Sequence, residues 1–147
     1  MLAVAFLLSS TALLEAPPAA GVDEPGLKKL QGKWQLTGQE HGGKKAAAKE
    51  VAGITLEVSK AGFTTREGVD VKEDASVVHL DAKARPAALD LKITAGPDLD
   101  KVVKGVWKLE GETLTVCIAE PGKDRPKEFK ASEGTGHTLL VFKKLKK

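Results

Sequence analysis

The side chains able to carry out chemistry in this chain are few and lie far apart. There is one cysteine, Cys117, and there are three histidines, His41, His79 and His137. Nucleophilic catalysis needs a serine, threonine or cysteine placed beside a base. Cys117 lies on the polar side of a strand-like stretch, which predicts a small side chain packed beneath a loop or helix. The alternative is a reactive thiol on the wet face of a sheet or inside a barrel.

Neither a metal site nor an acid–base pair is expected. A zinc site needs three or four ligands, often at short spacings such as His-x-x-x-His, and each histidine here stands alone. Acidic residues such as Glu57 and Asp90 alternate with apolar ones, which is typical of a solvated face rather than of paired carboxylates in a cleft. Gly134-Thr135-Gly136 lacks the lysine and the helix of a phosphate-binding loop. We therefore expect no enzyme activity, no metal and no cofactor.

Two tryptophans and one basic stretch are the remaining candidates for binding. Trp34 and Trp107 are suited to stacking on a ligand, although a tryptophan on an inner face is more often part of the core. Lys123 and Arg125 lie in a stretch with proline at both ends and could hold an anion; the alternative is an ordinary surface turn.

The elements that position these residues are predicted from the spacing of apolar residues. Apolar and polar residues alternate along most of the chain, which predicts strands with one solvent-exposed face. The 15 glycines and seven prolines favour short strands joined by tight turns. A short helical turn is expected around Leu27 and Leu30, and either a short helix or a loop over 44–52. The predicted strands cover 32–39, 54–59, 63–67, 69–73, 76–81, 89–93, 103–109 and 114–118, with 127–131 and 138–143 completing the series.

This series of short strands predicts the fold class. Parallel α/β folds need long helical crossovers between strands, and the chain has no room for them. A sheet of roughly eight strands with one buried face must close or split into two layers, and closure removes the exposed edges. We expect an all-β domain, a single antiparallel barrel of roughly eight strands, with a two-layer sandwich as the alternative.

The chain begins with a segment of different composition. Residues 1–20 are predicted to be a signal peptide, and residues 21–147 the barrel domain. The apolar stretch Leu2 to Leu14 is shorter than the roughly 20 residues of a membrane-spanning helix but has the length of a signal-peptide core. It lacks a basic n-region, so a mis-assigned start or an uncleaved anchor is the alternative. We expect export to the periplasm or outside the cell, with no stable membrane span after cleavage.

Charge and cysteine content narrow the classes of partner. The 23 basic and 20 acidic residues are interspersed, except in the C-terminal cluster of Lys143, Lys144, Lys146 and Lys147. Nucleic-acid binders usually concentrate basic residues in a stripe, so we expect no nucleic-acid partner and interpret the terminal lysines as a solvated end. A single cysteine excludes an intramolecular disulfide.

A Gly-x-Trp motif opens the first predicted strand, at Gly32 and Trp34. It resembles the first-strand motif of the lipocalins, in which the tryptophan plugs the closed end of the barrel. In that family a basic residue near the end of the last strand packs over the tryptophan. The resemblance implies this role for Lys144, where arginine would be expected because it stacks better on an aromatic face.

A second resemblance covers residues 30–144. Over this range the chain resembles a family of small planctomycete proteins, which occur as stand-alone exported proteins and as modules of larger ones. The matching stretches are 30–34, 85–91, 105–114, Cys117, 121–126, Phe129 and 136–141. This resemblance implies a lipocalin-like fold and export, and it brings no known activity, substrate or catalytic residue.

Two functions fit these expectations. The first is binding of a small apolar molecule at a barrel mouth lined by Phe63, His79 or Trp107, because an eight-stranded barrel can hold one small ligand or fill with side chains. It requires a hollow interior. The second is a structural or protein-interaction module of the cell envelope without ligand, which requires a filled core and an exposed apolar patch.

Overall fold

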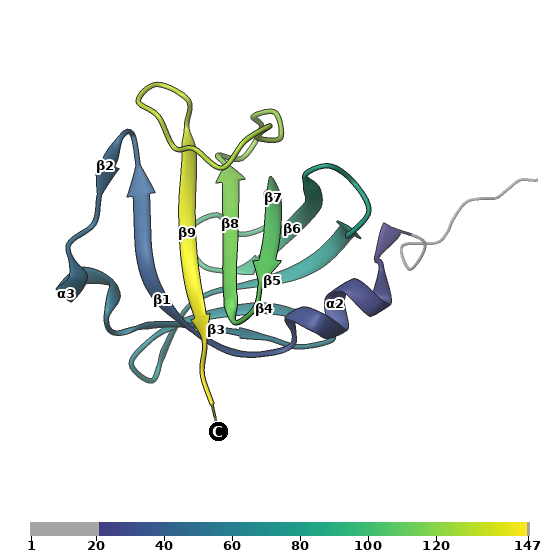
Figure 1. Ribbon diagram of the computed structural model, residues 1–147, viewed down its shortest axis with the longest axis horizontal. Coiled ribbons are helices and arrows are strands. Elements are labelled where there is room, and N and C mark those ends of the chain that lie inside the picture. Colours follow the sequence, from purple (N-terminus) through teal and green to yellow (C-terminus); the bar gives the residue numbers. More distant parts are fainter. Residues whose placement is uncertain (1–20, 147) are drawn as a thin grey trace, which may run out of the picture.

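The computed structural model describes residues 21–146, so the predicted signal peptide (1–20) lies outside the described residues. This part of the chain is mostly strand, with two short helices (Figure 1). The elements in order are α2 (Glu24–Leu30), β1 (Gly32–His41), β2 (Lys44–Lys45), α3 (Ala48–Val51), β3 (Ile54–Val58), β4 (Gly62–Glu67), β5 (Asp70–Asp81), β6 (Ala87–Ala95), β7 (Val102–Glu110), β8 (Thr113–Ala119) and β9 (His137–Lys144).

Eight of the strands form a closed antiparallel barrel, which confirms the predicted fold class. Each long strand pairs with the next in the order β1-β3-β4-β5-β6-β7-β8-β9, and β9 pairs back with β1. The closing register runs from Trp34 opposite Lys144 to His41 opposite Thr138. The two-residue strand β2 only extends the end of β1, so the barrel itself has no open edge.

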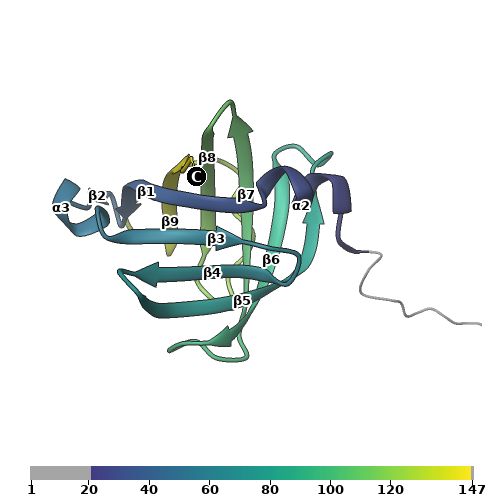
Figure 2. The same cartoon turned by 90° about the horizontal axis from the view of Figure 1, so that it is seen from below.

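Helix α2 packs across one end of the barrel, which we call the α2 end (Figure 2). The side chain of Asp23 caps the helix by accepting a hydrogen bond from the Gly26 amide (3.0 Å). Leu27 and Leu30 are buried and belong to the same core cluster as Trp34. The predicted helical turn is therefore present, and neither helix of residues 21–146 is long and apolar enough to cross a membrane.

Strand β5 differs from the prediction of two separate strands over 69–73 and 76–81. It is continuous, with irregular register between Asp74 and Ala75 and between Val77 and His79. A bulge inserts an extra residue and changes which residues face the core. Val77 therefore packs against the core while Val78 is 38% exposed, so Val78 does not share the buried face of Leu80, as strict alternation along 76–81 would require.

The predicted strand over 127–131 was also wrong. Residues 120–136 form one long irregular segment between β8 and β9. Pro126 and Ala131 are buried and Phe129 is half-buried against the outside of the barrel, so the spacing of apolar residues resembles that of a strand although the segment is not paired in the sheet. The segment is tied to the β1–β2 turn by the Gly43 amide, which donates to the Ala131 carbonyl (2.7 Å).

Candidate functional site

The interior of the barrel is occupied by its own side chains. One cluster of buried apolar residues extends from α2 through the strands to Val51 of α3. Phe63 is 7% exposed and Trp107 is 6% exposed, and both belong to this cluster. The Trp107 indole Nε1 donates to the Ala88 carbonyl (3.1 Å), which satisfies its polar atom within the fold. Both aromatic rings are therefore packing residues of the folded barrel.

The third predicted ligand-binding residue, His79, lies apart from the other two. It is half-buried on β5 beside the start of the described chain, where a Cβ on Gly21 would lie 3.6 Å from its Nδ1. Phe63 lines a small hollow on β4 and β5, and Trp107 lines another beside Arg85. The structure does not bring Phe63, His79 and Trp107 together at one pocket.

Strand β8 is buried on both faces. Leu114 and Val116 point into the barrel core, and Cys117 is buried on the other side, beneath the segment 120–136. The Cys117 Sγ lies 3.4 Å from the Lys130 carbonyl oxygen, and burial raises the pKa of this thiol. Cys117 is a small packed side chain, as its position in the sequence predicted.

Arg125 fastens this segment to the barrel. Its Nη1 donates to the carbonyls of Leu89 (3.2 Å) and Gly105 (2.9 Å) and lies 2.7 Å from Asp90 Oδ1. Both Nη1 hydrogens are used on the carbonyls. The buried Asp90 oxygen therefore accepts no aligned hydrogen bond from the described residues and interacts with the guanidinium as an ion pair.

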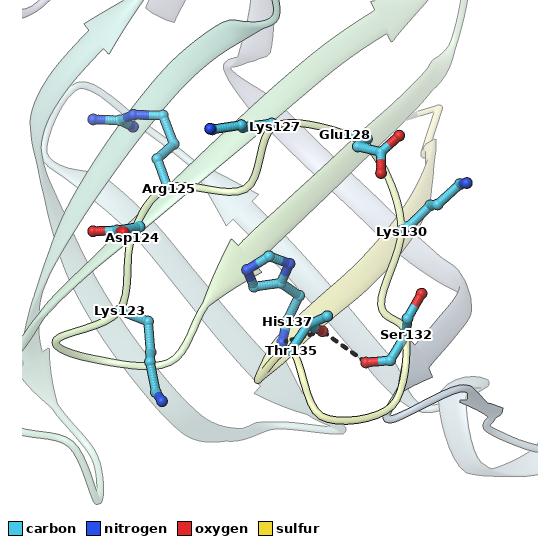
Figure 3. Close-up of a pocket in the computed structure, with 9 residues that line it drawn as sticks. All are labelled: Lys123, Asp124, Arg125, Lys127, Glu128, Lys130, Ser132, Thr135 and His137. Atoms are coloured by element: carbon cyan, nitrogen blue, oxygen red, sulfur yellow. Dashed lines mark hydrogen bonds between the residues drawn. The ribbon is translucent and has the colours of Figure 1, made fainter.

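A shallow hollow of about 350 Å³ lies over the same segment (Figure 3). Lys123, Lys127 and Lys130 line it, but their side chains point in different directions, and Arg125 is already engaged by the barrel. A site for an anion needs donors that converge on one point. The basic residues of this stretch do not form such an arrangement.

The histidines are distributed over separate places as well. His41 Nδ1 lies 2.9 Å from Thr138 Oγ1, across the β1–β9 pairing, and His137 borders the hollow over 120–136. Within residues 21–146, no three His, Cys, Asp or Glu side chains are grouped so that they could hold a metal ion.

The α2 end has a defined arrangement around Trp34. The indole Nε1 donates to the Leu30 carbonyl (2.9 Å), and Lys144 Nζ lies 4.8 Å from the ring centroid. Lys144 also donates to the Gln31 carbonyl (2.8 Å). A Cβ on Gly32 (φ 132°) would lie 2.8 Å from Lys144 Nζ, so glycine is needed for this contact. A cation over the tryptophan is the arrangement that the resemblance to lipocalins implies.

An open groove of about 840 Å³ crosses the same end, where β1, β3 and the C-terminal residues meet. It is larger than the hollows beside Trp107 (490 Å³) and over 120–136 (350 Å³). We call it the α2-end groove. It is lined by Gln31, Gly32, Lys33, Glu57, Val58, Lys144, Leu145 and Lys146.

Sequence reasoning missed this groove. Its residues come from three separate stretches, and two of the terminal lysines, which the sequence predicts to be a solvated end, line it. The only local signal was an apolar residue, Leu145, between lysines at the end of the last strand. The Leu145 amide donates to the Lys33 carbonyl (2.9 Å), which places the C-terminal residues along the start of β1.

Comparisons with known proteins add no assignment. The chain matches no protein-family model, and neither the curated proteins nor the solved structures contain a significant match. The two resemblances described from sequence motifs therefore stay predictions, and the function has to be argued from the geometry of this chain.

Proposed function

We propose that this protein is an exported binding module of the cell envelope that recognises a partner protein on the outside of its barrel, at the α2-end groove. The observation that supports this is the contrast between the two available spaces. The barrel interior is filled by core side chains, whereas the groove is open and lined by both apolar and cationic residues. No catalytic step is part of the proposal.

The alternative is a small apolar molecule bound within the barrel, and its binding would cost free energy. A ligand between Phe63 and Trp107 would have to displace buried side chains, and each apolar side chain contributes roughly 1.5–3 kcal/mol through its burial. The groove is already open in the folded state, so a partner can bind there without disturbing the core.

Native mass spectrometry separates these two alternatives. The domain comprising residues 21–147 would be isolated from its own host and measured before and after denaturation. We expect the mass of the polypeptide alone. A reproducible additional mass that disappears on denaturation would favour a bound small molecule and would count against the proposal.

Affinity capture tests the partner and its location. The immobilised domain would be exposed to envelope extract as wild type, as Lys33→Glu/Lys146→Glu at the groove, and as Lys44→Glu/Lys49→Glu. The last pair makes the same charge change at exposed positions near β2 and α3. We expect specific proteins to bind the wild type and the control variant and to be lost from the groove variant. Equal binding by all three, or equal loss from both variants, would contradict the proposed site.

Export is the part of the proposal that rests on residues 1–20. Cell fractionation of the host, followed by N-terminal sequencing of the native protein, tests it directly. We expect the protein in the periplasm or outside the cell, with an N-terminus close to Gly21. A full-length protein in the cytoplasm would exclude an envelope role.

A further inference from the structure

We infer that the α2-end groove receives an extended acidic segment of a partner protein, with one apolar side chain against the exposed Leu145 and carboxylates against Lys33 and Lys146. This inference rests on the proposed function, since it names the partner chemistry of that same site. It follows from the charge, the shape and the rigidity of the groove.

The charge of the surface is strongly unbalanced. Lys33, Lys144 and Lys146 line the groove, and an adjoining hollow of about 510 Å³ adds Lys28 and Lys60. Within residues 21–146 none of these five lysines forms an ion pair with a carboxylate. Such cations attract acidic partners and guide their approach.

The acidic side chains of the same surface do not balance the lysines. Among residues 21–146, Glu24 lines only the adjoining hollow, and Glu57 is the one acidic side chain that lines the groove itself. Glu57 lies 3.9 Å from Arg66 and opposite Lys33 in the β1–β3 register, so this one carboxylate lies beside two cations. Lys33 and Lys146, which are exposed and form no ion pair among the described residues, are the lysines of the groove that a partner's carboxylates can reach.

The shape favours a segment of chain over a membrane surface. A protein that lies on a membrane inserts protruding apolar side chains into the lipid, whereas this feature is hollow. The most exposed aliphatic residues, Val69 (88%) and Leu99 (53%), lie in turns at the opposite end of the barrel. A hollow lined by Leu145 and by lysine side chains can instead accept an apolar side chain flanked by carboxylates.

The groove is held open by contacts within the fold. Lys144 is fixed over Trp34 and bonded to the Gln31 carbonyl, and the Leu145 amide is bonded to Lys33. These contacts fix the floor and one wall before any partner arrives. A preformed site loses less conformational entropy on binding than a flexible one.

Selection from a library of displayed random peptides tests the inference, because it does not require the partner to be identified first. The target is the folded domain of residues 21–147. Lys33→Glu/Lys146→Glu and Lys44→Glu/Lys49→Glu serve as the groove variant and the matched control. We expect enriched peptides that combine at least two Asp or Glu residues with an adjacent aliphatic or aromatic residue.

Two measurements on the enriched peptides decide the outcome. Their affinity is expected to fall about tenfold or more on the groove variant and with added salt, and to stay unchanged on the control variant. Backbone NMR shifts are expected at Gly32, Lys33 and Leu145. Peptides without acidic residues, peptides that bind both variants equally, or binding only to phosphatidylglycerol vesicles would each overturn the inference.

The inference and the proposed function fail in different ways. If capture finds a partner that depends on the groove but the selected peptides are not acidic, only the partner chemistry is wrong. If capture shows no dependence on Lys33 and Lys146, the proposed binding site itself is wrong.

Discussion

Arg125 shows how one side chain connects distant parts of the molecule. Its guanidinium binds the carbonyls of Leu89 on β6 and Gly105 on β7 while its own backbone belongs to the segment 120–136. That segment covers Cys117, which would otherwise lie on the outside of β8. The positive charge of Arg125 suggested anion binding, but its hydrogen bonds instead hold the segment 120–136 against the barrel.

Arg125→Ala is therefore expected to loosen the segment and expose Cys117. Losing hydrogen bonds from a charged donor costs about 1.5–3 kcal/mol, and Asp90 loses its cationic partner. We expect the Cys117 thiol to react with a disulfide reagent roughly tenfold faster or more, because a destabilised cover opens more often. Thiol titration under native conditions measures this.

Lys123→Ala is the matched control for that experiment. Lys123 lies in the same segment, and its exposed side chain has no contact with the barrel among the described hydrogen bonds and ion pairs. In the Lys123→Ala variant, Cys117 is expected to react at the same rate as in the wild type. An Arg125→Ala protein that reacts as slowly as wild type would show that Arg125 does not hold the segment in place.

At the scale of the elements, alternation predicted most strands but not their irregularities. The bulge before His79 and the apolar segment around Phe129 both escaped prediction. Alternation reports that one face is buried, but it does not show what covers that face. A bulge depends on the partner strand, and Phe129 is half-buried because Lys108 and the outside of the barrel lie beside it.

The turn between β3 and β4 depends on Gly62. Its φ is 151°, and a Cβ there would overlap the carbonyl oxygen of Ala75 on β5. We expect Gly62→Ala to lower the free energy of unfolding by more than about 3 kcal/mol, or to prevent folding, since the backbones must separate. Gly68→Ala is the control, because a Cβ at Gly68 (φ 62°) meets nothing within 4 Å and costs only about 1–2 kcal/mol of backbone strain. Urea unfolding compares them, and equal losses would contradict the steric explanation.

Glu73 of β5 gives the barrel a pH dependence near the β6–β7 turn. Burial, and then the negative charge of Asp98, raise the pKa of its carboxyl group above 4.5. Because the pKa of Glu73 is higher in the folded state than in the unfolded state, the protonated carboxyl group favours the folded state. This stabilisation is fully present below the unfolded-state pKa and is lost as the pH rises through the folded-state pKa. Lys101, which pairs with Asp98 at 3.5 Å, only partly offsets the repulsion.

Glu73→Gln removes this repulsion. We expect the variant to have a higher Tm than wild type at pH 7 and a nearly equal Tm at pH 4, where the wild-type carboxyl is largely protonated in both states. Thermal unfolding at the two pH values provides the comparison. The same difference in Tm at both values would rule out titration of Glu73 as its cause.

At the scale of the whole molecule, closure joins the two ends of the domain. β9 pairs with β1 on one side and with β8 on the other, and it contributes Phe142 to the core. The pairing of Trp34 with Lys144 is also what assembles the α2-end groove. The binding surface and the stability of the barrel therefore depend on the same long-range contact.

Removing β9 tests that dependence. A chain of residues 21–136 would leave β1 and β8 with unpaired edges, and we expect it to be unfolded or to aggregate. A chain of residues 21–145 keeps β9 and the Leu145 contact and is expected to fold. Dispersion of the backbone amide NMR signals distinguishes the two. A folded barrel without β9 would mean that closure is not required.

The sequence by itself determined the class of fold, most of the strands, the helical turn and the packing of Cys117, because these follow from the local alternation of apolar and polar residues. It did not determine the filled interior, the double burial of β8, the role of Arg125 or the α2-end groove. Each of these depends on which residues from distant stretches become neighbours. Strand register and barrel closure decide which residues become neighbours, and a local sequence pattern does not specify them.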